Sequence, residues 1–537
     1  MKINSINPFY SSILFTSISF LLLLVFCKPI LNSDDDIYFL YTLAGGYGNK
    51  PTFLLHYSYG WNPLISWPVS IFFKWQPAFN WYSLLLIFIQ FLSCLNITYW
   101  LFATFKKATP LIYSIAYFLF FQSAFLLSLN YSNTSFIAAI SGGSSLLLYY
   151  FNKNEKIFSS KRHLFFSLSL LLISGLLRMH GLLLINMLLL WIGLFCLPFQ
   201  FYKKFFTVIF TSFLFVLFLA FLQNYYYTTR IPGWKTEEKQ RQSFYYIINH
   251  PRNENILDTG LRGTKNAFIQ NWFVYDTSFI SSNDLESFSN KRISNRIKTP
   301  DQNISIANWT YINIRVYLIL FLSLLIPSIL KRDLRTIRQW GLMLIGPIGL
   351  FFFLSIFLKV TIGIYITLFY SIFFSGIICL NKTIKIRRSY LVLSFLLLTN
   401  CTWMFIRIYK INKQNIASIN TTRCLFKELK NNKDLLFVAT NLDFNDNGYY
   451  IWDTPAEFPL NNILNKDLLI TNSYKETLQH FKINNLMDDL LFKTNIILIG
   501  DTHLMLEDYY FQKFKIRIKL IPDPKFKCLD AFKIMVN

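Results

Sequence analysis

The chain has 537 residues, of which 53% are hydrophobic and 15% are charged. Soluble globular proteins carry about 25% charged residues, so this composition argues against an entirely soluble protein. The apolar content and the presence of only seven cysteines exclude disordered chains, collagen-like repeats and small disulfide scaffolds. Length and hydropathy together predict one large membrane domain with appended soluble parts.

The positive charge is unevenly distributed along the chain. The formal net charge is +24, yet residues 414–537 carry 15 basic and 15 acidic side chains, so the whole excess belongs to residues 1–413. A nucleic-acid-binding protein would place a basic stripe on a soluble face. Basic residues between apolar runs are instead typical of loops that face an anionic lipid leaflet. We therefore expect membrane lipids as partners, and no nucleic acid.

Apolar runs of spanning length recur through the first three quarters of the chain. A transmembrane helix takes about 17–25 residues. The first run is expected to remain as an uncleaved helix, because no small-residue cleavage site follows it. The sequence thus predicts an α-helical multi-pass membrane protein with eleven spans, at 9–27, 82–103, 110–129, 135–151, 164–178, 182–199, 205–222, 314–330, 340–358, 361–380 and 389–406.

Lys and Arg in the short loops predict the orientation, since cytoplasmic loops are enriched in these residues. With a cytoplasmic N-terminus, the inside segments hold 17 basic residues, whereas the short outside turns hold Arg178 and Lys359. We therefore predict a protein of the cell inner (plasma) membrane whose N-terminus is cytoplasmic. An odd number of spans then places the C-terminal part outside the cytoplasm.

Three non-membrane parts are predicted on the outer side. They are the loops 28–80 and 223–313 and the tail of the chain. We divide the chain into a transmembrane domain, residues 1–409, and an extracytoplasmic domain, residues 410–537. The two outer loops belong to the first of these domains.

The tail has the pattern of a small α/β domain. Apolar stretches at 434–440 and 495–500 are bounded by turn residues and predict buried strands. Residues 503–514 predict a helix, and residues 515–520 alternate as a half-buried strand does. We expect the C-terminal domain to be built from these elements.

Three consecutive carboxylates follow the first predicted span. Asp34, Asp35 and Asp36 are three of only four acidic residues in residues 1–236. A carboxylate at the bilayer centre costs about 2.5–3.5 kcal/mol, so the triplet must face water, a cavity or cations. One interpretation is a hydrated turn that caps a helix starting near Ile37, with an Asp at the N-cap. The other is a general base at the outer surface of the membrane.

Glycines and aromatic residues follow the triplet. Residues 44–48 predict a turn, because no strand–Gly–helix context supports a phosphate-binding loop. The aromatic residues from Tyr57 to Tyr82, Trp61 among them, are typical of an interfacial belt. Aromatic rings also form stacking surfaces for carbohydrates, so sugar binding by Tyr57 and Trp61 remains open.

Arg178 lies between two apolar runs at the predicted outer boundary, and His180 follows it closely. A charged residue in this position is a functional candidate, and the planar guanidinium of Arg can donate two parallel hydrogen bonds to a phosphate. The alternatives are an Arg that extends to the lipid headgroups and a His that is a polar turn residue. Arg241, in the second outer loop, is either a further anion-binding cation or a solvated surface charge.

No motif demands a cofactor. The sequence holds no HExxH, CxxC or clustered His pattern, so a dedicated zinc site is not expected. A divalent cation near the aspartates remains open. Cys424 and Cys528 both fall in the tail and can pair in an oxidising compartment, although the sequence does not show that they meet.

Several stretches resemble a known family. They are similar to a bacterial branch of multi-pass proteins that resembles the GT-C-type glycosyltransferases. The similarity covers roughly residues 10–410 and extends weakly into the tail. The stretches that carry it are 32–38, 44–46, 80–82, 175–178 with Gly181, 240–243 and 264–272.

The resemblance implies a polyprenyl-phosphate-linked sugar as donor and a glycan, lipid or protein as acceptor. Asp35 and Asp36 match the family's catalytic acidic pair in the first outer loop. The chain departs from the family's pattern in two places: Met179-His180 follows the Arg motif, and Asn266-Ala267 replaces an Asn-Asp pair. We expect catalysis by Asp35 and Asp36, and substrate binding by Asp34, Arg178, His180, Arg241, Tyr57 and Trp61.

This chemistry has a simple physical account. A carboxylate removes the proton of an acceptor hydroxyl, which attacks the anomeric carbon while the lipid phosphate leaves with negative charge. A preorganised cation facing that charge contributes about 3–4 kcal/mol. Arg178 is the first candidate for this cation and Arg241 the second.

Other functions remain open from the sequence alone. A polymerase of lipid-linked oligosaccharides also uses Arg residues in outer loops but needs no acidic base after the first helix. A transporter or flippase for lipid-linked sugars would show broken helices in paired halves, and Gly346-Pro347 has no counterpart in the other half. In a non-catalytic scaffold, the neutral tail would bind a partner.

Overall fold

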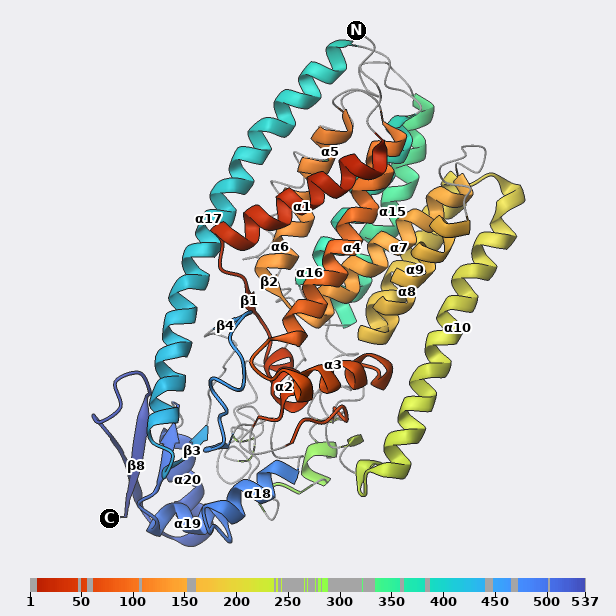
Figure 1. Cartoon of the computed structure of the whole chain (residues 1–537). Coiled ribbons are helices and arrows are strands. Elements are labelled where there is room, and N and C mark those ends of the chain that lie inside the picture. The colour runs from red at the N-terminus through yellow and green to blue at the C-terminus, as the bar shows by residue number, and fades with distance from the viewer. Residues whose placement is uncertain are drawn as a thin grey trace.

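The computed structural model describes most of the membrane bundle, most of the first outer loop and the tail (Figure 1). Of the second outer loop it describes only short pieces and single residues. The described residues are 7–46, 50–55, 61–105, 109–151, 161–235, 238–239, 243, 265, 268, 276, 279–281, 283–287, 321, 334–357, 362–381, 387–439, 448–464, 472–500 and 503–536.

Long apolar helices form the membrane part of the molecule. Seven of the described helical segments are long and apolar enough to cross a membrane. The predicted class, an α-helical multi-pass membrane protein, is confirmed. The segments are α1 (Pro8–Phe26), α4 (Trp81–Thr104), the continuous run of α5 (Thr109–Tyr117), η1 (Phe118–Gln122) and α6 (Ser123–Leu127), α7 (Tyr131–Phe151), α9 (Met179–Cys196), α10 (Phe199–Arg230) and α15 (Leu334–Phe357).

Three further helices coincide with predicted spans: α8 (Lys161–Leu177), α16 (Ile362–Asn381) and α17 (Arg387–Asn431). The predicted span at 314–330 lies outside the described residues except for Phe321, which is helical. The number of membrane crossings therefore stays a prediction.

Small residues place α7 in the centre of the bundle. A Cβ added at Gly142 would meet the carbonyl oxygen of Ser167 on α8 at 2.6 Å, and one added at Gly143 would collide with Leu189 of α9. Small side chains let helix backbones approach closely inside a membrane. The neighbours of α7 can thus pack tightly against a helix that presents no bulk on these sides.

Helix α2 (Asp34–Ala44) begins at the aspartate triplet. Ser33 is its N-cap, and the hydroxyl of Ser33 accepts a hydrogen bond from the backbone N–H of Asp36 at 3.3 Å. The predicted start near Ile37, with an Asp at the N-cap, is therefore wrong. The helix ends at Gly45, whose φ of 88° favours glycine, so the chain turns where the glycine cluster predicted a turn.

Helix α3 (Pro63–Trp75) lies across the end of the bundle rather than along it (Figure 1). It buries Val69 and Phe73, while Leu64, Trp67 and Trp75 are exposed. A helix that exposes large apolar side chains on one face is typical of the membrane interface. The first outer loop is thus attached to the bundle end beside the aspartates.

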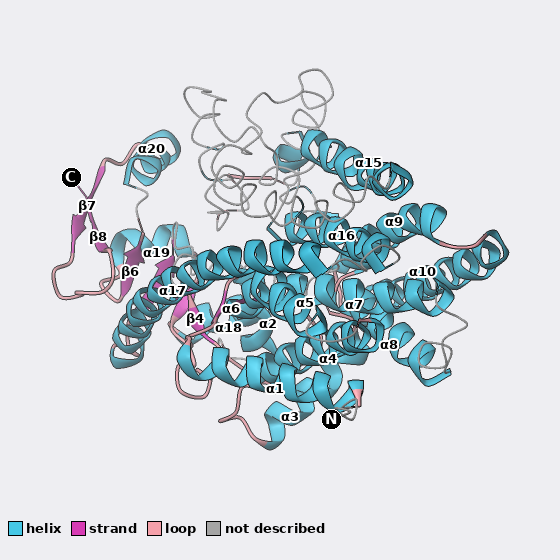
Figure 2. Ribbon diagram, turned by 90° about the horizontal axis from the view of Figure 1, so that it is seen from above, coloured by secondary structure: helices cyan, strands magenta, loops and turns pink. Residues whose placement is uncertain are grey.

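The tail is an α/β domain that projects to one side of the bundle (Figure 2). Strand β3 pairs in parallel with β5 and β6, while β8 pairs antiparallel with β6 and β7. Its strands, in sheet order, are β5 (Ile463–Leu464), β3 (Leu436–Ala439), β6 (Ile496–Ile499), β8 (Ala531–Val536) and β7 (Ile518–Pro522), and its helices are α18 (Asn472–His480), α19 (Leu486–Phe492) and α20 (His503–Phe514).

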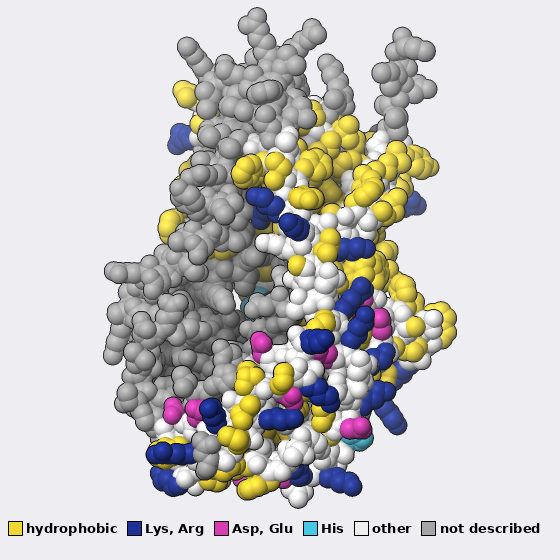
Figure 3. Space-filling view, turned by 90° about the vertical axis from the view of Figure 1, so that its left-hand side faces the viewer, with side chains coloured by type: hydrophobic (Ala, Val, Ile, Leu, Met, Phe, Trp, Pro, Cys, Tyr) yellow, Lys and Arg dark blue, Asp and Glu magenta, His cyan; other side chains and the backbone are white. Residues whose placement is uncertain are grey.

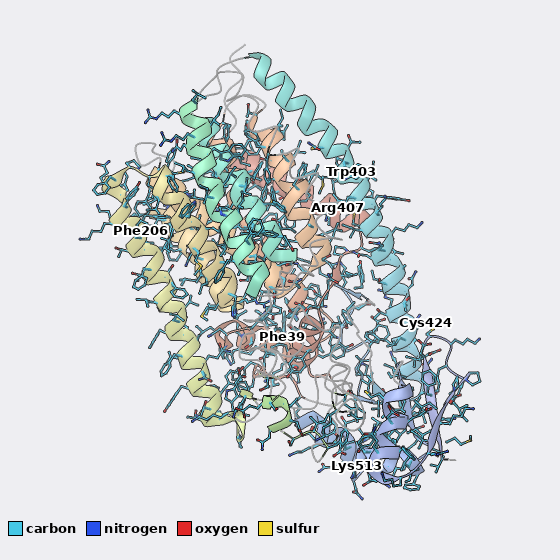
Figure 4. The ribbon with its side chains drawn as sticks, turned by 180° about the vertical axis from the view of Figure 1, so that it is seen from behind. Phe39, Phe206, Trp403, Arg407, Cys424 and Lys513 are labelled. Carbon is cyan, nitrogen blue, oxygen red and sulfur yellow. A yellow bond between two sulfur atoms is a disulfide. The ribbon has the colours of Figure 1, made fainter. Side chains whose placement is uncertain are left out.

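Helix α17 connects the bundle to the tail without a break. It continues past position 409, where the sequence was divided into two domains, as far as Asn431, and so belongs to both parts. A disulfide joins Cys424 of this helix to Cys528, with the Cα atoms 5.8 Å apart (Figure 4). The carboxylate of Glu428 also accepts a hydrogen bond from the backbone N–H of Cys528 at 3.1 Å.

Described pieces of the second outer loop pack on the tail. Phe268 and Phe279 lie against Tyr509, with ring centroids 5.1 and 4.9 Å from that ring. Asp276 accepts hydrogen bonds from the Tyr509 hydroxyl and the Lys513 ammonium group. This second outer loop and the C-terminal domain therefore share one apolar core.

A small sheet lies between the bundle and the tail. Its strands are β2 (Ser128–Leu129), β1 (Ile30–Leu31) and β4 (Tyr449–Tyr450), in that order. Strand β1 is parallel to β2 and antiparallel to β4. The sheet therefore joins three segments that are far apart in the sequence.

Candidate active site

The aspartate triplet lies at the beginning of α2, shortly after strand β1. Successive helical residues point about 100° apart, so neighbouring carboxylates in this turn face different surroundings. Asp36 is completely buried, whereas Asp35 is half-buried. The side chain of Asp34 lies outside the described part of the structure. The structure thus gives Asp35 and Asp36 distinct environments.

Two tyrosines hold the carboxylate of Asp36. The Tyr82 hydroxyl, at the start of α4, donates a hydrogen bond to Oδ1, and the backbone N–H of Tyr131 donates another at 2.9 Å. The other oxygen, Oδ2, is buried and has no hydrogen-bond partner among the residues that the structure describes. Burial raises the pKa of Asp36 to about 7, although the hydrogen bonds favour its charged form.

Tyr131 also contacts the two other charged groups of this region. Its hydroxyl donates a hydrogen bond to Oδ2 of Asp35 at 3.2 Å. The guanidinium carbon of Arg178 lies 5.6 Å from the centre of the Tyr131 ring, which is a cation–π distance. One tyrosine therefore connects Asp35, Asp36 and Arg178 at the end of the bundle.

Arg178 occupies the junction between α8 and α9. Its backbone is extended, with φ −162° and ψ 109°, and its carbonyl oxygen accepts a hydrogen bond from the Ser135 hydroxyl at 3.0 Å. The guanidinium donates a hydrogen bond to the Ser132 hydroxyl. A Cβ added at Gly181 would meet Ser135 Oγ at 2.5 Å, so glycine allows this close contact between α7 and α9.

The structure also describes two other predicted site residues, His180 and Trp61. His180 is exposed in the first turn of α9. Trp61 is fully buried: its ring stacks on Tyr82 with centroids 4.8 Å apart and lies 6.4 Å from Phe39. In this structure its ring therefore has no free face for a sugar.

Tyr57 and Arg241, both predicted to bind substrate, lie outside the described residues. The same holds for most of the second outer loop, including Asn266 and Ala267. Their roles stay predictions. Within the described part of the chain, no group of three or more His, Cys, Asp or Glu side chains is placed to hold a metal ion.

The structure adds site residues that the sequence did not single out. Tyr131 and Ser132 belong to a short polar stretch between two apolar runs, and this pattern was the only available signal. Tyr82 was noted as an aromatic residue of the first outer loop, but its contact with Asp36 depends on tertiary packing. Phe39, labelled in Figure 4, packs against the same cluster, since its ring centroid lies 5.1 Å from that of Tyr131.

Comparisons with known proteins give one structural likeness. No protein-family model matches the sequence, and none of the curated proteins matches it. The fold is similar to the crystal structure of ArnT from Cupriavidus metallidurans in the apo state, with a TM-score of 0.44 and 10% sequence identity. This similarity covers 97% of each chain.

Proposed function

We propose that this protein is a membrane glycosyltransferase of the GT-C type. It would move a sugar from a polyprenyl-phosphate donor to a glycan, lipid or protein acceptor at the outer face of the inner membrane. The observation that carries the proposal is the convergence of Asp35, Asp36 and Arg178 around Tyr131 at one end of a membrane bundle. The motifs that resemble this family contain the same aspartates and the same arginine.

In this proposal Asp35 is the general base. Its carboxylate is only half-buried, so an acceptor hydroxyl can reach it. Asp35 takes the hydroxyl proton as the acceptor oxygen forms a bond to the anomeric carbon. The bond between that carbon and the phosphate oxygen breaks, and the lipid phosphate leaves with the electron pair.

Arg178 supplies positive charge for the leaving phosphate. Its guanidinium uses one nitrogen to bond Ser132 and lies over the Tyr131 ring, so its position is set before a substrate arrives. Preorganised charge is effective because it costs no reorganisation during the reaction, and a group of this kind is worth about 3–4 kcal/mol.

Asp36 acts through its neighbours rather than on the substrate. Its carboxylate is covered on all sides and accepts hydrogen bonds from Tyr82 and Tyr131. Tyr131 in turn contacts the base and the arginine. We therefore assign Asp36 as a positioning residue, which refines the expectation that both aspartates are catalytic.

Replacing the base tests the proposal. Asp35→Asn keeps the shape of the side chain but removes its basicity, so we expect transfer to fall by about 10²–10⁴-fold. The assay follows sugar transfer from a polyprenyl-phosphate sugar by the purified full-length protein, with the elution profile as a folding control. Asp523→Asn, in an ion pair of the tail, is the matched carboxylate control. Wild-type turnover by Asp35→Asn would exclude this residue as the base.

The role of the arginine is tested separately by binding. Arg178→Ala should weaken binding of the polyprenyl-phosphate donor by about 10²-fold, and Arg178→Lys should recover part of the loss, because Lys keeps the charge but not the planar fork. Mass spectrometry of co-purifying lipids and titration with the donor measure both effects. Equal donor affinity in all three proteins would contradict a phosphate-binding role.

A further inference from the structure

Strand β4 of the tail belongs to the small sheet whose other strands, β1 and β2, lead into the candidate site. It pairs with β1, and β1 pairs with β2. Strand β1 ends three residues before Asp34, the first residue of α2, whose first turn carries Asp35 and Asp36. Strand β2 ends two residues before Tyr131. Backbone hydrogen bonds in this sheet therefore fix the points from which the chain continues to the aspartates and to Tyr131.

The chain just after β4 is linked to the helix turn that carries Tyr82, a hydrogen-bond partner of Asp36. The backbone carbonyl of Asp453 accepts a hydrogen bond from the side-chain amide of Asn80 at 2.8 Å. Asn80 is the N-cap of α4, and its oxygen accepts from the backbone N–H of Ser83 at 3.0 Å. Tyr82, the hydroxyl donor to Asp36, lies in this capped turn. One segment of the tail is thus linked to β1 and to the first turn of α4.

An ion pair fixes this segment to α17. Arg423 donates from Nε to Oδ2 of Asp453 at 3.0 Å and from Nη2 to Oδ1 at 2.6 Å. The Asp453 side chain is only 6% exposed. The guanidinium also lies 5.2 Å from the ring centre of Tyr450 in β4. A two-bond Arg–carboxylate contact constrains orientation as well as distance.

Helix α17 is tied to the same two strands from the other side. The side-chain amide of Asn415 donates hydrogen bonds to the carbonyl oxygens of Lys28, at 2.9 Å, and Leu127, at 3.2 Å. These carbonyls belong to residues just before β1 and just before β2. The helix that bears Arg423 therefore constrains the start of β1, which pairs with β4, and the start of β2, which pairs with β1.

We propose that Arg423 is a positioning residue of the active site, through which the C-terminal domain sets the geometry of the carboxylates. The inference rests on the proposed function for its effect on turnover. A misplacement of about 1 Å far from the chemistry can cost about 10²-fold in rate. In this proposal the tail supports the site through the ion pair between Arg423 and Asp453. Without that ion pair, the bundle would hold the same residues in a less productive arrangement.

The test compares Arg423→Gln, Arg423→Lys and the wild type as full-length proteins. We expect Arg423→Gln to lower kcat by about 10²-fold with little change in KM for the lipid donor. Arg423→Lys should recover part of the loss because it keeps the charge. In parallel, hydrogen exchange followed by mass spectrometry should show faster exchange in segments 28–36 and 127–135, with no change in α8 or α9.

The matched control is the ion pair between Lys533 and Asp523, 2.9 Å long, at the β7–β8 end of the same domain. Lys533→Gln removes a cation from the tail without touching β4, so it should alter neither kcat nor exchange in the two segments. Equal effects of Lys533→Gln and Arg423→Gln would mean that any loss of charge in the tail has this result, and would overturn the inference.

The exchange measurement separates the two proposals. Faster exchange in both segments of Arg423→Gln supports the positioning role of Arg423, even if the wild type transfers no sugar. Absence of transfer by the wild type would count against the proposed function alone. Unchanged exchange together with unchanged kcat overturns the positioning role of Arg423 and leaves the proposed function intact. Faster exchange throughout the bundle would indicate general unfolding and would also overturn it.

Discussion

Asp36 shows how strongly its neighbours determine the state of a single carboxyl group. It lies beside Asp35 in the sequence, yet Asp36 has no exposed surface, and within the described part of the chain its Oδ2 has no hydrogen-bond partner. Loss of hydration disfavours the charged form, so its pKa rises to about 7. The hydrated acidic turn considered from the sequence therefore does not describe Asp36.

This buried carboxyl predicts a pH dependence of stability. The pKa of an Asp has a reference value of 3.8 in the absence of such burial, so between about pH 4 and about pH 7 the unfolded chain releases the proton that the folded protein keeps. The free energy of unfolding then falls as the pH rises through this range. Asp36→Asn cannot ionise, so its Tm should rise by several degrees relative to the wild type between about pH 5 and about pH 8.

Thermal unfolding of both proteins across this pH range is the measurement. Asp523→Asn is the control, because the hydrogen bond from Lys533 lowers the pKa of Asp523 and its titration falls below the range. A difference in Tm between wild type and Asp36→Asn that stays constant with pH would show that Asp36 is already ionised in the folded protein.

At the scale of elements, α17, the tail strands and the first outer loop form one unit connected by strand pairing and a disulfide. The helix begins in the bundle and ends in the tail, so the domain boundary expected near residue 409 falls inside a continuous helix. Strand β4 pairs with β1, and the disulfide joins α17 to the segment that precedes β8. The tail is therefore connected, through α17 and the pairing of β4 with β1, to the strand before the aspartates.

The disulfide should stabilise this unit. It closes a loop with a sequence separation of 104 residues, and such a crosslink contributes about 2–4 kcal/mol, mainly by restricting the unfolded chain. We expect Cys424→Ser combined with Cys528→Ser to make the tail susceptible to proteases at lower temperature. Limited proteolysis of the full-length protein over a temperature series measures the shift. Treatment of the wild type with a reductant should match the double variant, and resistance unaffected by either change would contradict this role.

At the scale of the whole molecule, the two ends of the bundle differ in character. The starts of α5, α8, α10, α15 and α17 lie at one end, and α2, α3 and the tail lie at the other (Figure 1). On the face formed by α17 and the tail, apolar side chains gather above and Lys and Arg gather below (Figure 3). Along α17 the exposed Trp403, Phe405 and Tyr409 precede the exposed Lys410 and Lys413. This order is typical of a membrane boundary.

The predicted orientation can be tested by labelling. Lys161→Cys places a thiol at the end where α8 starts, and Lys433→Cys places one at the tail end; both positions are exposed. A thiol reagent that cannot cross membranes should label Lys433→Cys in intact cells and Lys161→Cys only after permeabilisation, because Lys and Arg favour the cytoplasmic side. The wild type is a suitable background, since Cys27, Cys94, Cys196 and Cys401 are buried. The reverse pattern would invert the topology.

Local patterns in the sequence were sufficient for the elements of this protein. Apolar length predicted the described spans, because a bilayer demands about 20 apolar residues per helix whatever their neighbours are. Turn residues around apolar stretches likewise predicted β3 and β6, and periodicity predicted α20 with its observed bounds. The concentration of Asp34, Asp35 and Asp36 marked the region of the candidate site.

Only the tertiary structure decided how those residues are used. Tyr131 and Arg178 meet because α7 packs between α8 and α9, and Trp61 is covered because its ring stacks on Tyr82. The link from the tail to β1 depends on a pairing between residues more than 400 positions apart, as between Ile30 and Tyr450. Burial and pairing over such distances depend on how the helices pack, and no window of sequence contains both partners.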